Sequence, residues 1–194
     1  MSAKMSDVTA VADKPAARMP LVDISTLNDP ELDVIIEKAR RLSTPKPAWY
    51  QTLASNPGVA KAFAHYWDTA FRNGRVEHEI KELMRNCVAQ LMGCSFCSTQ
   101  RSTQAIEEGL SEQAIATCAL PDFQHPNPRT RAALRLAREL ALDDASKDPS
   151  RFDAVYAELH AVFDNEEIME LAGICVLFVG GTRLARSLGI DRVT

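Results

Sequence analysis

The sequence has no excess of positive charge. It holds 22 Lys and Arg residues against 26 Asp and Glu residues, which gives a formal net charge of -4 at pH 7. A protein that binds DNA or RNA needs a basic surface to pair with the phosphates. We therefore expect no nucleic-acid partner.

Long apolar runs are missing as well. The most apolar stretch, LAGICVLFVGG at residues 171–181, is shorter than the ~20 apolar residues that span a bilayer, so we expect no membrane partner. The first residues, MSAKMSDVTAVADKPAARMP, contain no continuous apolar stretch of the kind that a secretory signal needs. We interpret residues 1–19 as a flexible polar leader.

The number of cysteines is odd. The chain has five cysteines, and an odd number in a chain without a secretory signal does not favour a framework of structural disulfides. This usage indicates the reducing cytoplasm. Three of the five, Cys87, Cys118 and Cys175, lie in apolar helical patterns that are typical of small buried side chains.

Strand patterns are absent, and helix signals take their place. No run of residues alternates between apolar and polar side chains with the Val, Ile and Thr content of a strand. Caps followed by proline, such as Asp29-Pro30 and Asn56-Pro57, are typical of helix starts, and Gly74, Gly93, Gly109 and Gly189 are typical of helix ends. The sequence predicts an all-α bundle with helices over residues 31–42, 58–71, 76–92, 94–108, 112–120, 129–142, 150–163 and 166–188.

We expect one helical domain over residues 20–194. The segment PDFQHPNP, at 121–128, holds three prolines and divides the chain into a motif region at 76–120 and a second half at 128–190. The final helix is apolar around most of its circumference near its middle, so it needs cover on several sides. A homo-oligomer would supply that cover, and a central buried helix in a monomer is the alternative.

The stretch GCSFCSTQR, at 93–101, contains Cys94 and Cys97 three positions apart. At a helix start this spacing puts both sulfurs near one face, within reach of each other, and a helix start favours the thiolate form. Such a small ring adds little to fold stability, so a disulfide here would serve chemistry. The pair can also be read as half of a metal site or as two apolar residues.

Two charged residues, Glu82 and Arg101, are spaced so that they could lie near this cysteine pair. Glu82 is eleven positions before Gly93, which is close to a whole number of helical turns, so its carboxylate could exchange protons with a sulfur. The alternative for Glu82 is an exposed charge that pairs with a neighbour such as Arg85 or Asn86. Arg101 could hold an anionic substrate group or lower a thiol pKa, or it could be a solvated surface residue.

A metal site and a cofactor site are not expected. Zinc needs four ligands, and neither the other cysteines nor the four histidines form a second pair at finger-like spacing. The sequence contains no Gly-rich phosphate loop, no nucleophile elbow and no H-E-x-x-H motif. The aromatic residues Trp49, Tyr50, Tyr66 and Trp67 either line a pocket or fill the core.

The stretch ELMRNCVAQLMGCSFCSTQRSTQAIEEG, at residues 82–109, resembles the carboxymuconolactone decarboxylase family, which includes the alkylhydroperoxidase D-like proteins. The resemblance covers roughly residues 20–190 and implies an all-helical fold that assembles as trimers or hexamers. In alkylhydroperoxidase D-like members a glutamate is followed, after eleven residues, by C-x-x-C-x-x-x-H, and Glu82, Cys94 and Cys97 match this pattern. By this resemblance Cys97 attacks the peroxide, Cys94 is its partner, and an external thiol reductant restores both.

The chain departs from the pattern at Arg101, which occupies the position of the final histidine. An arginine does not pass protons near neutral pH as an imidazole does, so proton delivery would depend on Glu82 and water. The decarboxylase branch typically lacks the cysteine pair. Our leading interpretation is a thiol-disulfide oxidoreductase with modest alkyl hydroperoxide reductase activity. The alternative is a decarboxylase-like lyase or an organic-acid binding protein that uses Arg101 and has no redox turnover.

Overall fold

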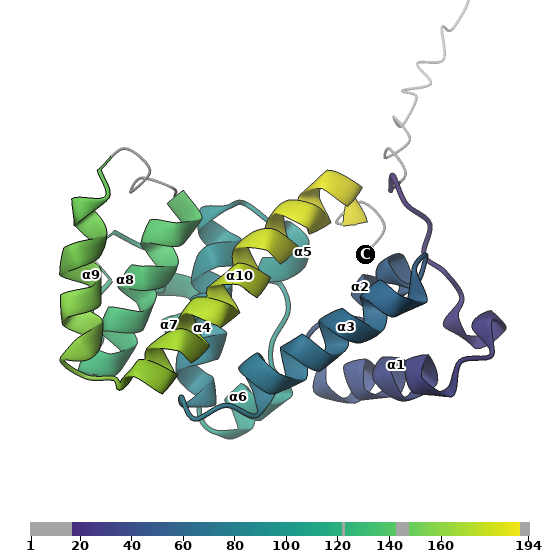
Figure 1. Cartoon of the computed structure of the whole chain (residues 1–194), viewed down its shortest axis with the longest axis horizontal. Helices are drawn as coiled ribbons and strands as arrows, with labels where there is room; N and C mark the ends of the chain where they lie inside the picture. Colours follow the sequence, from purple (N-terminus) through teal and green to yellow (C-terminus); the bar gives the residue numbers. More distant parts are fainter. Residues whose placement is uncertain (1–16, 122, 143–147, 191–194) are drawn as a thin grey trace, which may run out of the picture.

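The computed structural model describes residues 17–121, 123–142 and 148–190, and the regular structure of these residues is entirely helical (Figure 1). The predicted all-α fold is confirmed. Most of the predicted leader at 1–19 lies outside the described residues. The elements are the short helix η1 (Ile24–Leu27), α1 (Pro30–Leu42), α2 (Pro47–Leu53), α3 (Pro57–Trp67), the π-helical turn η2 (Asp68–Arg72), α4 (His78–Leu91), α5 (Ser95–Ser98), α6 (Thr103–Glu107), α7 (Glu112–Thr117), α8 (Pro128–Leu142), α9 (Ser150–His160) and α10 (Asn165–Leu188).

Several helices start where the local sequence places a cap. The Asp29 carboxylate accepts from two backbone N–H groups at the start of α1, and the Asn56 side chain accepts from one at the start of α3. Asp164 and Glu167 form a reciprocal capping box at the start of α10. Each cap satisfies N–H groups that the first turn of a helix leaves without partners, so these starts are set by short-range chemistry.

The predicted end of the second helix at Gly74 is wrong. The structure ends α3 at Trp67 and continues into η2, and Gly74 does not have a left-handed backbone. A Cβ atom at Gly74 would overlap the Glu170 carboxylate, which accepts from the backbone N–H groups of Arg75 and Val76. The glycine therefore permits a close approach between the η2–α4 loop and α10, which no local pattern reveals.

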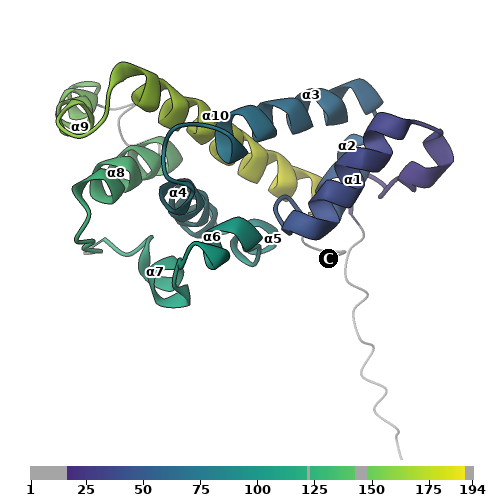
Figure 2. The same ribbon diagram turned by 90° about the horizontal axis from the view of Figure 1, so that it is seen from below.

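The helix α4 is the centre of the molecule. It packs against α8, α10 and α5, and every residue from 80 to 89 is buried. Figures 1 and 2 show α8 and α9 on one side of α4 and α10, and α1, α2 and α3 on the other. The cores of these two parts are separate apolar clusters, and Phe63 packs against both. The cysteine motif follows α4 directly and lies between the two parts.

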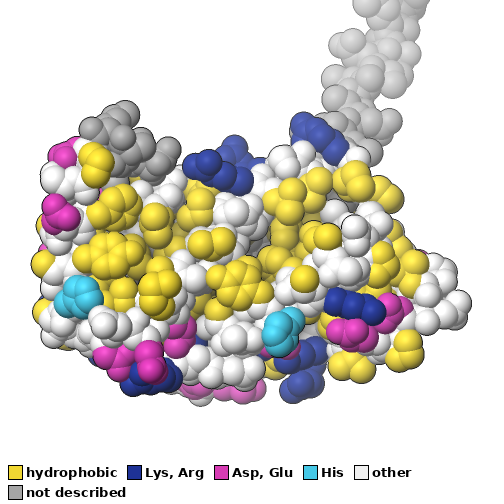
Figure 3. Space-filling view, in the orientation of Figure 1, with side chains coloured by type: hydrophobic (Ala, Val, Ile, Leu, Met, Phe, Trp, Pro, Cys, Tyr) yellow, Lys and Arg dark blue, Asp and Glu magenta, His cyan; other side chains and the backbone are white. Residues whose placement is uncertain are grey.

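The helix α10 has the length and composition of a membrane-spanning segment. Its Leu171, Ile174 and Phe178 are nevertheless buried in the core against α4 and α8, as expected for the core helix of a folded domain. Met169 and Val176 on the same helix are largely exposed, and apolar side chains gather on this face of the molecule (Figure 3). The predicted homo-oligomer through this helix stays a prediction.

Candidate functional site

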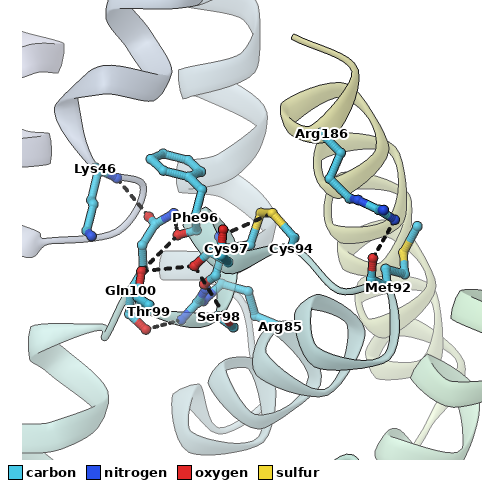
Figure 4. The surroundings of a disulfide bond; sticks show 11 residues. Lys46, Arg85, Met92, Cys94, Phe96, Cys97, Ser98, Thr99, Gln100 and Arg186 are labelled. Atoms are coloured by element: carbon cyan, nitrogen blue, oxygen red, sulfur yellow. Dashed lines mark hydrogen bonds between the residues drawn. A yellow bond between two sulfur atoms is a disulfide. The ribbon is translucent and has the colours of Figure 1, made fainter. Parts of the chain in front are cut away.

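The two sulfurs of the motif are joined in a disulfide between Cys94 and Cys97, whose Cα atoms are 5.3 Å apart (Figure 4). Gly93 has a φ of 63°, a left-handed conformation that lets the chain leave α4 and turn at once into α5. Cys94 is the N-cap of α5, and its sulfur accepts a hydrogen bond of 3.2 Å from the backbone N–H of Cys97. The local backbone thus holds both sulfurs at one helix start.

The two cysteines differ in their surroundings. The Cys94 side chain is buried, with 2% of the residue exposed, whereas Cys97 is half-buried. Cys97 lines a small cavity of about 50 Å³, and Cys94 is not among the described residues that line it. A small molecule in this cavity would therefore meet the Cys97 sulfur first.

The cavity at Cys97 has walls that are mainly aromatic. Trp49 from α2, Phe63 from α3 and Phe178 from α10 all contribute, so the site is assembled from elements far apart in the chain. The rings contact one another, with centroids 5.2 Å apart for Trp49 and Phe63 and 5.8 Å apart for Phe63 and Trp67. The polar side chains in the lining belong to Arg85, Cys97, Gln100 and Thr182.

The sequence left open whether four aromatic residues line a pocket or fill the core. The structure places Trp49 and Trp67 in the wall of the cavity, while Tyr50 lies elsewhere and Tyr66 donates its hydroxyl to the carbonyl of Gly173. The indole N–H groups of both tryptophans are buried and have no acceptor within the described part of the chain. These two N–H groups are enclosed by neighbouring side chains.

A buried ion pair between Glu82 and Arg85 holds the backbone of the cysteine loop. The Arg85 guanidinium donates to both oxygens of Glu82, through Nε at 2.8 Å and Nη2 at 2.7 Å. The same guanidinium donates to the carbonyl oxygens of Cys97 and Gln100, each at 2.7 Å (Figure 4). Arg85 thus connects α4 to the residue that carries the accessible sulfur, and it also lines the cavity.

Glu82 lies behind this arginine and not in the cavity lining. It is fully buried, and its Oε1 also accepts from the Asn86 side chain at 3.2 Å and from the backbone N–H of Ser102 at 3.0 Å. The carboxylate reaches the loop that follows the cysteines, at Ser102. The partners Arg85 and Asn86 are those of the alternative interpretation, although the carboxylate is buried rather than exposed. A role of Glu82 in proton transfer stays a prediction.

Gln100 joins the cysteine loop to the N-terminal helices. Its side chain accepts from the backbone N–H of Lys46 at 2.8 Å and donates to the carbonyl of Phe96 at 3.0 Å (Figure 4). On the other side of the motif, Arg186 of α10 donates to the carbonyl of Met92 at 2.6 Å. Contacts from both ends of the chain therefore set the position of the turn that bears the disulfide.

Sequence reasoning missed His78, at the start of α4. Its Nδ1 lies 3.1 Å from the carbonyl oxygen of Phe71, and its Nε2 lies 2.7 Å from the Ser102 hydroxyl. A carbonyl only accepts, so Nδ1 carries the proton and Ser102 donates to Nε2. Burial, the largest cause, lowers the pKa of His78 and favours the neutral ring. Its position one turn before Glu82 is the signal that could have identified it.

Arg101 points away from the cavity at Cys97. Its Nε donates to the Glu112 carboxylate at 2.9 Å, and its Nη1 donates to the carbonyls of Ser98 and Gln100. Together with Lys46 it lines a different, shallow surface hollow. The structure therefore does not bring Arg101 together with the cysteines and the aromatic walls, and its predicted role in substrate binding stays a prediction.

The remaining cysteines are buried free thiols, as predicted: Cys87, Cys118 and Cys175. Within residues 17–121, 123–142 and 148–190, no group of three or more His, Cys, Asp or Glu side chains is arranged to hold a metal ion.

Residues 57–139, which include α3, the cysteine motif and most of α8, match the carboxymuconolactone decarboxylase family. The resemblance to this family that the sequence suggests is confirmed over these residues. A curated relative, the uncharacterized protein YdfG of Bacillus subtilis (strain 168), is 24% identical over 119 residues, which cover 61% of this chain and 79% of YdfG.

Several solved structures share the fold of this chain. The debrominase Bmp8 is 20% identical, with a TM-score of 0.70 over 93% of this chain and 99% of Bmp8. An uncharacterized peroxidase-related protein of Ralstonia eutropha JMP134, described as an alkylhydroperoxidase AhpD core, is also 20% identical, with a TM-score of 0.72 over 91% of this chain and 92% of that one. At these identities the likeness establishes the alkylhydroperoxidase D-like fold.

Proposed function

We propose that this carboxymuconolactone decarboxylase family protein is a thiol-disulfide oxidoreductase that reduces organic hydroperoxides at Cys94 and Cys97. The observation that carries the proposal is the joined pair of sulfurs, of which Cys97 alone lines an aromatic cavity. An apolar cavity suits the carbon skeleton of an organic hydroperoxide. We place the reaction in the cytoplasm, where thiol reductants are available.

The oxidative half-reaction starts from the dithiol. The Cys97 thiolate attacks the distal oxygen of the hydroperoxide, a sulfur–oxygen bond forms, the oxygen–oxygen bond breaks, and the alkoxide leaves as an alcohol after taking up a proton. The Cys94 thiol then attacks the sulfenic sulfur, the disulfide forms, and the hydroxyl leaves as water with the Cys94 proton. Two thiols are oxidised, and the hydroperoxide is reduced to an alcohol and water.

The reductive half-reaction needs an external thiol. Because Cys97 is the more accessible sulfur, the external thiolate attacks it and forms a mixed disulfide, and Cys94 leaves as a thiolate. The Cys97 backbone N–H lies 3.2 Å from the Cys94 sulfur and stabilises that negative charge. A second external thiol then releases Cys97, so the cycle ends with the dithiol and an oxidised reductant.

We propose that Arg85 positions the attacking sulfur. Its hydrogen bond to the carbonyl of Cys97 holds the backbone of that residue, and Glu82 fixes the guanidinium in turn. Glu82 could also relay protons through a water that reaches Arg85. In this scheme the two residues act through the position of Cys97, and neither forms a bond to the substrate.

A second candidate reaction uses the same dithiol on a halogenated ring. The aromatic walls of the cavity favour it, as does the fold shared with Bmp8, a debrominase whose structure with 2,3,4-tribromopyrrole has a TM-score of 0.70 to this chain. In such a reaction the two thiols give up two electrons and two protons and form a disulfide. One proton replaces bromine on the ring carbon, and the other is released to solvent together with bromide.

The test is turnover of cumene hydroperoxide coupled to dithiothreitol, with release of bromide from a bromopyrrole measured in parallel. We expect cumyl alcohol to form, Cys97→Ser to lose most of the turnover, and Cys94→Ser to leave a sulfenic acid that dimedone traps. The matched control is Cys175→Ala, which removes a buried thiol outside the cavity and should retain turnover. Full hydroperoxide turnover in Cys97→Ser would refute the proposal, and bromide release without alcohol formation would favour the second candidate.

A further inference from the structure

A second and larger cavity lies away from the disulfide. It has a volume of about 500 Å³ and is formed by the α7–α8 connection together with α8 and α9. None of its lining residues lines the cavity at Cys97. Its walls combine apolar side chains, such as Leu120, Phe123 and Val162, with the guanidinium groups of Arg131, Arg135 and Arg138. The volume is in the range of small-molecule sites.

Cys118, at the end of α7, is one of the residues that line this cavity. The Cys118 thiol donates to the carbonyl of Ile115 at 3.2 Å and accepts from the Gln90 side chain at 3.6 Å. Gln90 comes from α4, which packs against α7. These contacts fix the Cys118 sulfur between the cavity and α4.

A second thiol lies directly behind Cys118. Cys87 of α4 is fully buried and lies one turn before Gln90, whose side chain reaches the Cys118 sulfur, so the two thiols lie on facing sides of the contact between α4 and α7. Neither residue belongs to the C-x-x-C motif, and they are distant in the sequence, so only the packing of α7 on α4 brings them together. Burial and then the nearby Cys87 thiol raise the pKa of the third free thiol, Cys175. Among the described residues, no hydrogen bond joins Cys175 to Cys87 or Cys118.

Arg138 completes the cluster. It donates to the carbonyl of Ala119 at 2.8 Å, which holds the backbone next to Cys118. The neighbouring Cys118 thiol and then the Arg138 charge lower the pKa of Cys87, against the opposing effect of burial. The Cys87 thiol and burial raise the pKa of Cys118. The cluster therefore places a cationic guanidinium close to two buried thiols.

We propose that Cys87 and Cys118 form a second redox-active thiol pair, which organic hydroperoxides reach through the cavity and oxidise to a disulfide. Cys118 is the sulfur that the oxidant meets, and Cys87 is the resolving partner. In the first step a sulfur–oxygen bond forms at Cys118, the oxygen–oxygen bond breaks, and the departing alkoxide takes the proton that Cys118 loses. In the second step Cys87 attacks the sulfenic sulfur, the disulfide forms, and water leaves with the Cys87 proton.

The balance is the same as at the first pair, with two thiols oxidised and one hydroperoxide reduced to an alcohol and water. The rate is different. Because Cys118 resists ionisation and the pair is buried, its first step is slower than that of Cys97, since the thiolate is the reactive form. The second pair is therefore oxidised after the first, at a higher hydroperoxide concentration, by oxidant that the first pair has not removed.

The experiment is titration of the reduced full-length protein with cumene hydroperoxide, followed by alkylation in denaturant and mass measurement. Formation of the Cys94–Cys97 disulfide should leave three alkylatable thiols. At a higher hydroperoxide concentration we expect the number of alkylatable thiols to fall to one, with Cys175 as the remaining thiol. Three thiols that persist after full oxidation of the first pair, or their conversion to sulfinic acids without a disulfide, would overturn the proposal.

The link is assigned in the Cys94→Ser/Cys97→Ser variant, in which trypsin places Cys87 and Cys118 in different peptides, the first covering residues 86–101. We expect a cross-linked peptide that dithiothreitol separates and that Cys175→Ala retains. A link from Cys118 to Cys175 contradicts the proposal. Since this variant lacks the first pair, the result is independent of the function proposed for that pair, and the wild-type thiol count provides the answer if the variant does not fold.

The route of the oxidant is tested by filling the cavity. Ala161 of the α9 C-cap lines it, so Ala161→Trp should slow oxidation of Cys87 and Cys118 several-fold while Cys94 and Cys97 react as before. Equal slowing of both pairs, or of neither, would show that the oxidant does not use this cavity.

Discussion

At the scale of single residues, Glu82 and Arg85 form a buried ion pair on which the position of the cysteine loop depends. Both side chains are buried, and the guanidinium binds the carboxylate and two carbonyls of the cysteine loop. Burying charge is costly unless the partner is present, so loss of one partner leaves the other unpaired. The sequence predicts the register of Glu82, but the choice between a free and a paired carboxylate depends on the loop at 97–102, which only the folded chain brings near.

Glu82→Gln should destabilise the protein by about 3–5 kcal/mol, because it leaves the Arg85 charge buried without compensation. Glu112→Gln is the matched control, since Glu112 is exposed and also pairs with an arginine, and its cost should be about 0–1 kcal/mol. Urea unfolding of the three proteins measures both. Equal costs for the two substitutions would contradict the account.

His78 should make stability depend on pH. Burial lowers its pKa in the folded state from the ordinary value of 6.5, so the unfolded chain binds the proton more tightly. Stability contributed by His78 is therefore complete above the unfolded pKa and falls as the pH drops through about 6.5 towards the folded pKa.

The measurement is urea unfolding at about pH 7.5 and about pH 5.5. Wild type should lose more stability between these conditions than His78→Gln, which keeps a hydrogen-bonding side chain but does not titrate. His160→Gln alters an exposed histidine and should behave as wild type does. A His78→Gln variant with the wild-type pH slope would exclude the residue as the source.

At the scale of elements, local patterns predict where most helices begin and where α10 ends, because caps and prolines act over a few residues. They fail after the cysteines, where one expected helix is divided into α5 and α6. The carbonyl of Gln100 binds Arg85 and the N–H of Ser102 binds Glu82, so tertiary partners take backbone groups that a continuous helix would use. No spacing within residues 94–108 indicates this competition.

In the turn between α4 and α5, replacement of Gly93 by any other residue should destabilise the protein. Gly93→Ala places a side chain at a φ of 63° and should cost about 1–2 kcal/mol, although nothing would contact the new methyl group. Gly180→Ala in the interior of α10 also meets open space and should stabilise the protein by about 0.5–1 kcal/mol.

Thermal unfolding of the two variants provides the comparison. Opposite signs are the expected outcome, because the two glycines differ only in the backbone conformation that they adopt. A loss of stability in Gly180→Ala as large as in Gly93→Ala would show that the α10 position has a packing role not seen in the structure.

At the scale of the whole molecule, the cavity at Cys97 is a property that no single segment contains. Its walls come from α2, α3, α4, α5 and α10, and the sequence could not distinguish wall aromatics such as Trp49 from core aromatics such as Tyr50. The same is true of Cys87 and Cys118, which are correctly predicted as buried but whose contact depends on the packing of α7 on α4.

The cavity should select substrates by size. Gly181 of α10 lines it, and a side chain added there meets open space, so Gly181→Leu should fill the cavity. We expect a raised KM for cumene hydroperoxide and little change with hydrogen peroxide, because only the larger molecule needs the volume. Gly180→Leu, outside the lining, serves as the control. A variant that loses both activities equally would indicate damage to the fold rather than occlusion.

A single-turnover measurement on the reduced protein, with cumene hydroperoxide limited to one equivalent, tests the proposed chemistry of Cys94 and Cys97 most directly. The account predicts one cumyl alcohol formed for each peptide 86–101 that loses two hydrogens, with the mass change confined to Cys94 and Cys97 and reversed by dithiothreitol. Hydroperoxide that remains intact while Cys97 stays fully alkylatable would contradict it.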